Sequence, residues 1–109
     1  MHLTLFQILA LLREEPADAS TVLEGLGRLL PDRDVPSLPA FYRHLRRAME
    51  SGWVEVEGTD PDDDGPGRPA RVYRLTREGA EALRERAREL EAFTSLALGG
   101  EGGGGGRER

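Results

Sequence analysis

The feature that most constrains the fold is a change in the spacing of apolar residues at Gly52. Before Gly52, apolar side chains recur every three or four positions in segments that prolines separate, a spacing typical of amphipathic helices. After it, residues 53–57 and 71–75 alternate apolar and polar side chains, which is typical of half-buried strands. The chain is therefore expected to form three helices followed by a β-hairpin.

Capping residues and prolines bound the expected helices. The first covers residues 3–14 and is apolar over more than one face, so we expect it to be buried on two sides. The second begins after Asp18 or Ser20, and its four leucines are expected to face inward. The third begins after Ser37, and Gly52 stands where a left-handed residue commonly follows a helix.

The residues after the hairpin predict a long helix and a disordered tail. Thr76 is the expected cap of a helix over residues 77–98, whose apolar side chains approximate a heptad repeat. Residues 99–109 hold seven of the 14 glycines and no apolar side chain, a composition typical of disorder. We therefore expect a winged-helix domain in residues 1–76, a dimerisation helix in residues 77–98 and a Gly-rich tail.

Composition excludes several classes of function. The chain has no cysteine and only two histidines, so neither a metal site nor a cofactor is expected. It has no apolar run near the roughly 18 residues that cross a bilayer, and no secretory signal, so we expect a cytoplasmic protein with no membrane partner. No nucleophile is paired with a base in a recognisable motif, and enzymatic activity is not expected.

Basic residues are clustered in a chain whose net charge is −5. All 15 of them are arginine, whose planar guanidinium binds phosphate or guanine through two parallel hydrogen bonds. The clusters are Arg43, Arg46 and Arg47 in the third helix, and Arg68, Arg71, Arg74 and Arg77 around the second strand. Two basic regions in an acidic chain indicate a local rather than a general affinity for anions.

Three helices followed by a hairpin is the element order of a winged helix-turn-helix, whose third helix enters the DNA major groove. The expected fold class is therefore mainly α with a small β-hairpin, followed by the C-terminal helix. On a helical projection, Arg43 and Arg47 lie opposite the apolar face formed by Leu38, Phe41, Leu45, Ala48 and Met49. This placement predicts that the two arginines read base edges in double-stranded DNA.

The other expected DNA contacts surround these two arginines. Ala40 is small enough to let the start of the helix approach the groove. The remaining basic and hydroxyl side chains of the set are expected to contact the DNA backbone. The full predicted DNA-binding set is Ser37, Ala40, Tyr42, Arg43, Arg46, Arg47, Arg68 and Arg71.

Three motifs resemble those of the PadR family of transcriptional regulators. The first is the run from Phe41 to Arg47, in a segment that ends at Gly52. The second is Gly-Pro-Gly-Arg-Pro at 65–69, and the third is Tyr-Arg-Leu-Thr-Arg-Glu-Gly at 73–79. The resemblance covers about residues 3 to 95 and implies the short type of this family, with a single C-terminal helix. It also implies a homodimer, built by the first and last helices, that binds a palindromic operator. The sequence departs from the family at Pro39, where glycine is common.

The predicted dimer interface consists of apolar residues from the first and last helices: Leu5, Phe6, Leu9, Leu83, Ala87, Leu90, Phe93 and Ala97. A pocket among some of these residues could bind a hydrophobic small-molecule effector, but a dry dimer core accounts for the same residues and is our preferred interpretation. The sequence thus predicts a homodimeric DNA-binding transcriptional regulator that represses its target. The alternative is a winged-helix module that binds proteins and does not bind DNA specifically.

Overall fold

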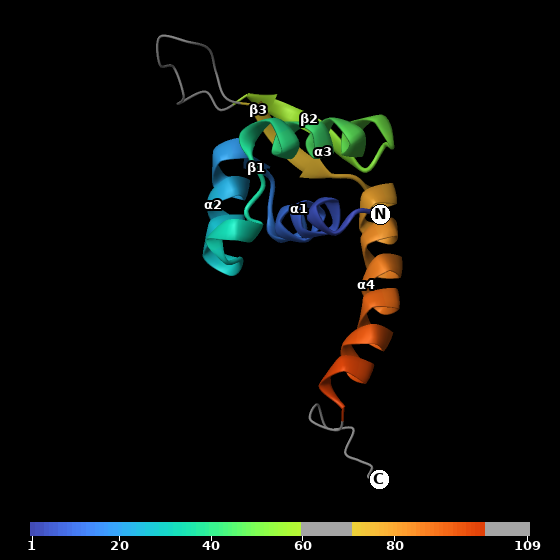
Figure 1. Ribbon diagram of the computed structural model, residues 1–109. Coiled ribbons are helices and arrows are strands. Elements are labelled where there is room, and N and C mark those ends of the chain that lie inside the picture. Colours follow the sequence, from blue (N-terminus) through green and yellow to red (C-terminus); the bar gives the residue numbers. More distant parts are fainter. Residues whose placement is uncertain (60–70, 100–109) are drawn as a thin grey trace.

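The computed structural model describes residues 1–59 and 71–99 of the chain. Its elements are α1 (Leu3–Glu14), β1 (Ala17–Asp18), α2 (Ala19–Leu29), the 3-10 turn η1 (Asp32–Asp34), α3 (Leu38–Glu50), β2 (Val54–Thr59), β3 (Arg71–Leu75) and α4 (Arg77–Leu98). In Figure 1, α1 lies in the middle, α2 and α4 flank it on opposite sides, and α3 lies with the sheet above it. The predicted fold class is confirmed.

Three helices begin at the capping side chains that the sequence offered. In each, a side-chain oxygen accepts a hydrogen bond from the backbone N–H three residues later: Asp18 from Thr21 at 2.8 Å, Ser37 from Ala40 at 3.3 Å and Thr76 from Gly79 at 3.0 Å. The choice between Asp18 and Ser20 is therefore settled in favour of Asp18, and Ser20 lies inside the first turn of α2.

The sheet has three antiparallel strands in the order β1-β3-β2, whereas the sequence predicted a hairpin of two. The additional strand is Ala17–Asp18, in which Ala17 pairs with Tyr73 and Asp18 with Val72. Two residues are too few to show the alternation that identifies a strand, so only the position of β3 makes this segment a strand. The register between β2 and β3 shifts between Val56 and Gly58, which marks a bulge.

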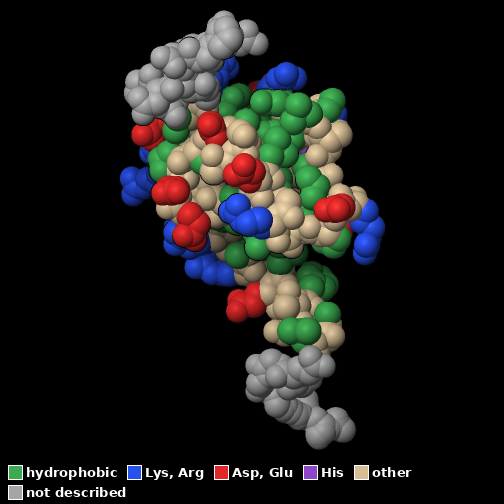
Figure 2. Space-filling model, turned by 90° about the vertical axis from the view of Figure 1, so that its left-hand side faces the viewer, with side chains coloured by type: hydrophobic (Ala, Val, Ile, Leu, Met, Phe, Trp, Pro, Cys, Tyr) green, Lys and Arg blue, Asp and Glu red, His purple; other side chains and the backbone are tan. Residues whose placement is uncertain are grey.

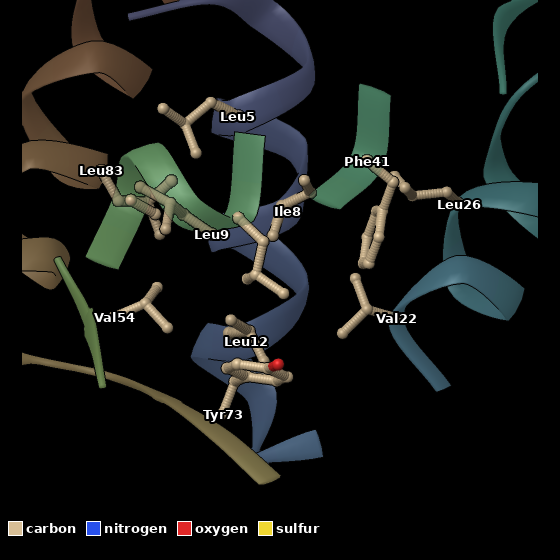
Figure 3. Packing of buried hydrophobic residues seen from close by; sticks show 12 residues of the cluster. Leu5, Ile8, Leu9, Leu12, Val22, Leu26, Phe41, Val54, Tyr73 and Leu83 are labelled. Atoms are coloured by element: carbon tan, nitrogen blue, oxygen red, sulfur yellow. The ribbon is translucent and has the colours of Figure 1, made fainter. Parts of the chain in front are cut away.

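The core surrounds α1, as the apolar pattern of this helix predicted. Ile8 and Leu9 have no exposed surface, and side chains from α2, α3, α4 and the sheet pack around them. Figure 3 shows Phe41 beside the side chains from α2 on one side of α1, and Leu83 beside Leu9 on the other. The buried cluster comprises Leu5, Ile8, Leu9, Leu12, Val22, Leu26, Phe41, Leu45, Ala48, Val54, Tyr73 and Leu83.

Two leucines that were expected to face inward lie on the surface. Leu29 at the end of α2 is 71% exposed, and Leu38 at the start of α3 is 56% exposed. Both lie at a terminal turn of their helix, where the described residues leave most of their side chains uncovered. The apolar faces of α2 and α3 are therefore shorter than their sequence patterns indicated.

One junction connects the end of α3 to the start of α4. Gly52 has a φ of +80°, the left-handed conformation expected after α3. Its carbonyl oxygen accepts a hydrogen bond from the Thr76 hydroxyl at 2.6 Å, while the Trp53 carbonyl oxygen accepts one from the Thr76 N–H at 2.9 Å. Since Thr76 also caps α4 through Gly79, a single side chain links the two helices across the sheet.

Replacing Thr76 by alanine is expected to destabilise the protein by about 1–2 kcal/mol, because it removes both the helix cap and the hydrogen bond to Gly52. The Thr76→Ser variant keeps the hydroxyl and should retain most of the stability. Thermal unfolding followed by circular dichroism compares the two at one protein concentration. Equal losses for both variants would contradict the assignment of the effect to the hydroxyl.

The second half of α4 extends away from the rest of the chain (Figure 1). Leu83 in its second turn is 5% exposed, but Phe93 and Leu96 are 69% and 76% exposed. Figure 2 shows hydrophobic side chains on the projecting part of the molecule. In the parts of the chain that the structure describes, no helix is both long enough and apolar enough to span a membrane.

Candidate nucleic-acid interface

The outer face of α3 carries arginines because its inner face is apolar. Phe41, Leu45 and Ala48 are buried against α1, and residues on the opposite side must therefore point to solvent. The exposed residues of the predicted set on or beside this helix are Ser37, Tyr42, Arg43, Arg46 and Arg47, and Ala40 is half-buried. The face thus presents three guanidinium groups and one phenol, with Ser37 at the N-terminus of the helix.

The predicted DNA contacts in the wing, the hairpin of β2 and β3, are Arg68 and Arg71. Arg71 is exposed at the start of β3, so it remains a candidate for contact with DNA. Arg68 lies outside the described residues, as does the tail after Gly99. For these segments the predictions stay predictions.

Arg74 belongs to the second basic cluster of the sequence but is paired on the surface of the sheet. It stands opposite Glu55 in the strand register and forms an ion pair with that carboxylate. A second glutamate, Glu57, lies 3.7 Å from its guanidinium. No acid lies within three residues of Arg74 along the chain, yet the neighbouring strand supplies two. The positive charge available to a ligand at the sheet is therefore smaller than the arginine count suggested.

A pair of histidines lies on the flank of the arginine face. The rings of His2 and His44 are 4.4 Å apart and tilted by 40°. Burial lowers the pKa of His44 below its ordinary value, and the positive neighbours His2, Arg43 and Arg47 lower it further. His2 also accepts a hydrogen bond at Nδ1 from the Thr4 N–H at 3.0 Å and so caps α1. No local pattern could have found this pair, because His2 precedes the first helix and His44 lies in the third.

The predicted dimer residues separate into two groups. Leu5, Leu9 and Leu83 fill the core of a single chain, with 5% or less of their surface exposed, so they have no area to offer a second subunit. This corrects their assignment, and the reason is that α1 and α4 pack on each other within one chain. Phe6 and Leu90 are half-buried, and Ala87, Phe93 and Ala97 are exposed. Only this second group has exposed apolar surface that a second subunit could cover.

Comparison with known proteins rests on structure, because the sequence matches no protein-family model and no curated protein. A PadR-like transcription factor from Bacteroides fragilis superimposes with a TM-score of 0.70 at 23% identity, covering 86% of this chain and 85% of that one. A PadR family transcriptional regulator from Eggerthella lenta gives a TM-score of 0.62 at 27% identity, covering 84% of this chain and 71% of that one. The chain has the winged-helix fold of these PadR-like regulators.

A further solved structure that matches this chain contains DNA. It is PadR from Bacillus subtilis in complex with operator DNA, with a TM-score of 0.67, 16% identity, and coverage of 88% of this chain and 61% of that one. At that identity the likeness concerns the fold. The resemblance to PadR-like regulators that the motifs indicated is confirmed in the fold, whereas the individual DNA-contacting residues of this chain stay predictions.

Proposed function

We propose that the chain is a transcriptional regulator that binds operator DNA as a homodimer and represses the adjacent gene. The observation that carries this proposal is the exposed arginine face of α3, on a fold that related regulators share. Arg43 and Arg47 are one helical turn apart, and both are exposed. In a major groove they can each donate two hydrogen bonds to guanine O6 and N7.

The other residues of this surface have positioning roles in the proposal. Tyr42 and Arg46 on α3, and Arg71 at the base of the wing, contact backbone phosphates and set the orientation of the helix. Ser37 and Ala40 lie at the start of α3, where the helix enters the groove. Arg68 is assigned the same phosphate-contacting role because of its place in the sequence. These contacts raise the affinity for any duplex without reading its sequence.

The dimer in this proposal is formed by the exposed apolar side of α4. Ala87, Leu90, Phe93 and Ala97 follow one another at intervals of three or four residues, with Phe6 of α1 as an additional member. Residues 1–76 then constitute the DNA-binding domain and residues 77–98 the dimerisation helix. A twofold dimer places two copies of α3 in successive major grooves, and this arrangement requires a palindromic operator.

The test is a mobility-shift titration with the duplex upstream of the chain's own gene, at several salt concentrations and with unrelated duplex as competitor. Neutralising six to ten phosphates makes affinity fall roughly 10³- to 10⁵-fold between 50 and 200 mM salt. A complex that survives the competitor and weakens in this way supports the proposal. Folded dimer that never shifts DNA would favour the protein-interaction module, whose apolar interface is nearly indifferent to salt.

Replacing Arg43 by alanine is expected to reduce the preference for operator over unrelated duplex by about 1–3 kcal/mol for each half-site, the value of one bidentate base contact. That loss corresponds to about 5- to 150-fold per half-site in the ratio of the two dissociation constants. The Arg71→Ala variant should instead weaken both duplexes equally and lower the salt slope by about 1 for each half-site.

The matched control is Arg28→Ala, which removes the same charge from the last turn of α2. It should leave the preference unchanged. If Arg43→Ala weakened operator and unrelated duplex by the same factor, then Arg43 would be a backbone contact and the assignment of base reading to it would be wrong.

A further inference from the structure

A pocket of about 460 Å³ opens between the start of α1, the flank of α3 and the segment that follows α3. Five of its lining residues carry hydrogen-bond donors in their side chains, apart from the indole of Trp53: His2, Arg43, His44, Arg47 and Ser51. Leu5 and Trp53 contribute apolar surface. A pocket of this size admits a small molecule or one charged group of a larger one.

The charges that face this pocket are all positive or potentially positive. Arg43 and Arg47 come from α3, His44 lies between them in the sequence, and His2 stacks on His44 from the start of α1. Among the described residues, no aspartate or glutamate lines the pocket. Bringing two arginines and two histidines together without a carboxylate is unfavourable, and an anion in the pocket would remove that repulsion.

The two histidines differ in the hydrogen bond and the charge that they can offer to such an anion. His2 accepts the Thr4 N–H at Nδ1, so its neutral form carries its proton on Nε2 and can donate from there without a charge. His44 has its pKa lowered by burial and by the cations around it, so it is mostly neutral near pH 7. An anion beside His44 would favour its charged form and raise that pKa again.

We propose that this pocket binds a tetrahedral oxyanion, a phosphate or sulfate group, between Arg43, Arg47 and the protonated ring of His44. The phosphate group can belong to the DNA backbone or to a small molecule. The first source rests on the DNA binding of the proposed function, but it replaces the base contacts of Arg43 and Arg47 with contacts to the backbone. Binding takes up a proton at His44, so affinity increases as the pH falls through the pKa of that residue. His44 and His2 are then positioning residues for the phosphate, in addition to the arginines.

Trp53 provides the signal for the test, because it is the only tryptophan of the chain and lines the pocket. Sulfate is the probe, since its charge does not change in the range used. Titration with sulfate at constant ionic strength, with chloride as the balancing ion, should give a saturable change of fluorescence. The affinity should be higher at pH 5.5 than at pH 8, by at most about tenfold for each unit by which the anion raises the pKa of His44.

Two variants and one direct measurement separate this site from general screening. His44→Gln keeps a hydrogen-bond donor but cannot gain a charge, so its sulfate affinity should change less with pH than that of the wild-type protein. Arg28→Gln removes a positive charge from α2 and should behave like the wild-type protein. The pKa of His44, measured by NMR in the unmodified protein, should rise when sulfate is added. This last readout does not depend on the folding of any variant.

A second arm distinguishes the source of the phosphate. If operator DNA binds more tightly at low pH and His44→Gln abolishes this dependence, then the pocket holds a backbone phosphate. If sulfate saturates the site as described but no duplex is bound, then the anion site is supported and its ligand is a small oxyanion. The same result would contradict the proposed function. Unsaturable sulfate titrations, together with a His44 pKa that neither sulfate nor DNA raises, would overturn the inference.

Discussion

Replacing Gly79 by alanine is expected to destabilise the protein by about 3 kcal/mol, at the upper end of the range for overpacked positions. A Cβ atom at this position would fall well inside van der Waals contact with the carbonyl oxygen of Trp53, and 2.8 Å from Cδ1 of Leu75. The leucine side chain can move, but the backbone oxygen cannot, because it accepts the hydrogen bond from the Thr76 N–H. The added methyl group must therefore push α4 away from the sheet.

Two other helical glycines serve as matched controls for this substitution. Gly27 is exposed in α2 and has no atom within 4 Å of an added Cβ, so Gly27→Ala should stabilise the protein by about 0.5–1 kcal/mol through helix propensity. Gly25 would meet the side chain of Leu11 at 3.0 Å, and Gly25→Ala should fall between the two. Urea unfolding at one protein concentration ranks the three variants. Equal stability of the Gly79 and Gly27 variants would contradict the close approach of α4 to Trp53.

Replacing Phe93 by glutamate is expected to raise the dissociation constant of the proposed dimer at least about a hundredfold. Burying one phenylalanine side chain is worth about 1.5–3 kcal/mol, and a twofold interface contains this position twice. The substitution removes that burial and places a charge in an apolar contact, which costs more. Mass measured by light scattering over a range of concentrations should therefore shift from dimer to monomer.

The control for this change is Ser95→Glu, which adds the same charge two residues away. Ser95 lies on the opposite side of α4 from the apolar residues, since each residue of a helix turns by 100°. It should leave the mass unchanged. An unchanged mass for Phe93→Glu as well would refute the α4 interface. If Phe93→Glu gives a monomer, its affinity for a palindromic duplex should also fall, because two half-sites can no longer be bound together.

The arginine face of α3 could be predicted from the sequence because it depends on one helix alone. The cap at Ser37, the helical spacing of Phe41 and Leu45, and the alternation of residues after Gly52 are all local signals. A helix that buries one side must expose the other, so the placement of Arg43 and Arg47 followed without knowledge of the other elements. The identification of a winged helix required only the order of these segments.

The other half of the candidate site depends on which segments meet. Arg74 has no acid within three residues along the chain and pairs with Glu55 only because β2 and β3 pair in this register. His2 and His44 meet in the pocket beside Arg43 and Arg47 only because the start of α1 lies next to α3. Contacts between residues so far apart follow from packing and strand register, which no window of neighbouring residues contains.

The sequence by itself determined which segments form the four helices and the two strands of the hairpin, which side of α3 is polar, and that basic charge gathers there. These properties arise from capping, helical period and strand alternation, and each of them acts within about four residues. Only the tertiary structure decided that Ala17–Asp18 is a strand, that Leu5, Leu9 and Leu83 fill the core rather than an interface, and that two histidines meet beside the arginines. The physical reason is that the chemistry of a side chain favours an apolar or an oppositely charged neighbour, whereas the packing of the whole chain decides which residue occupies that place.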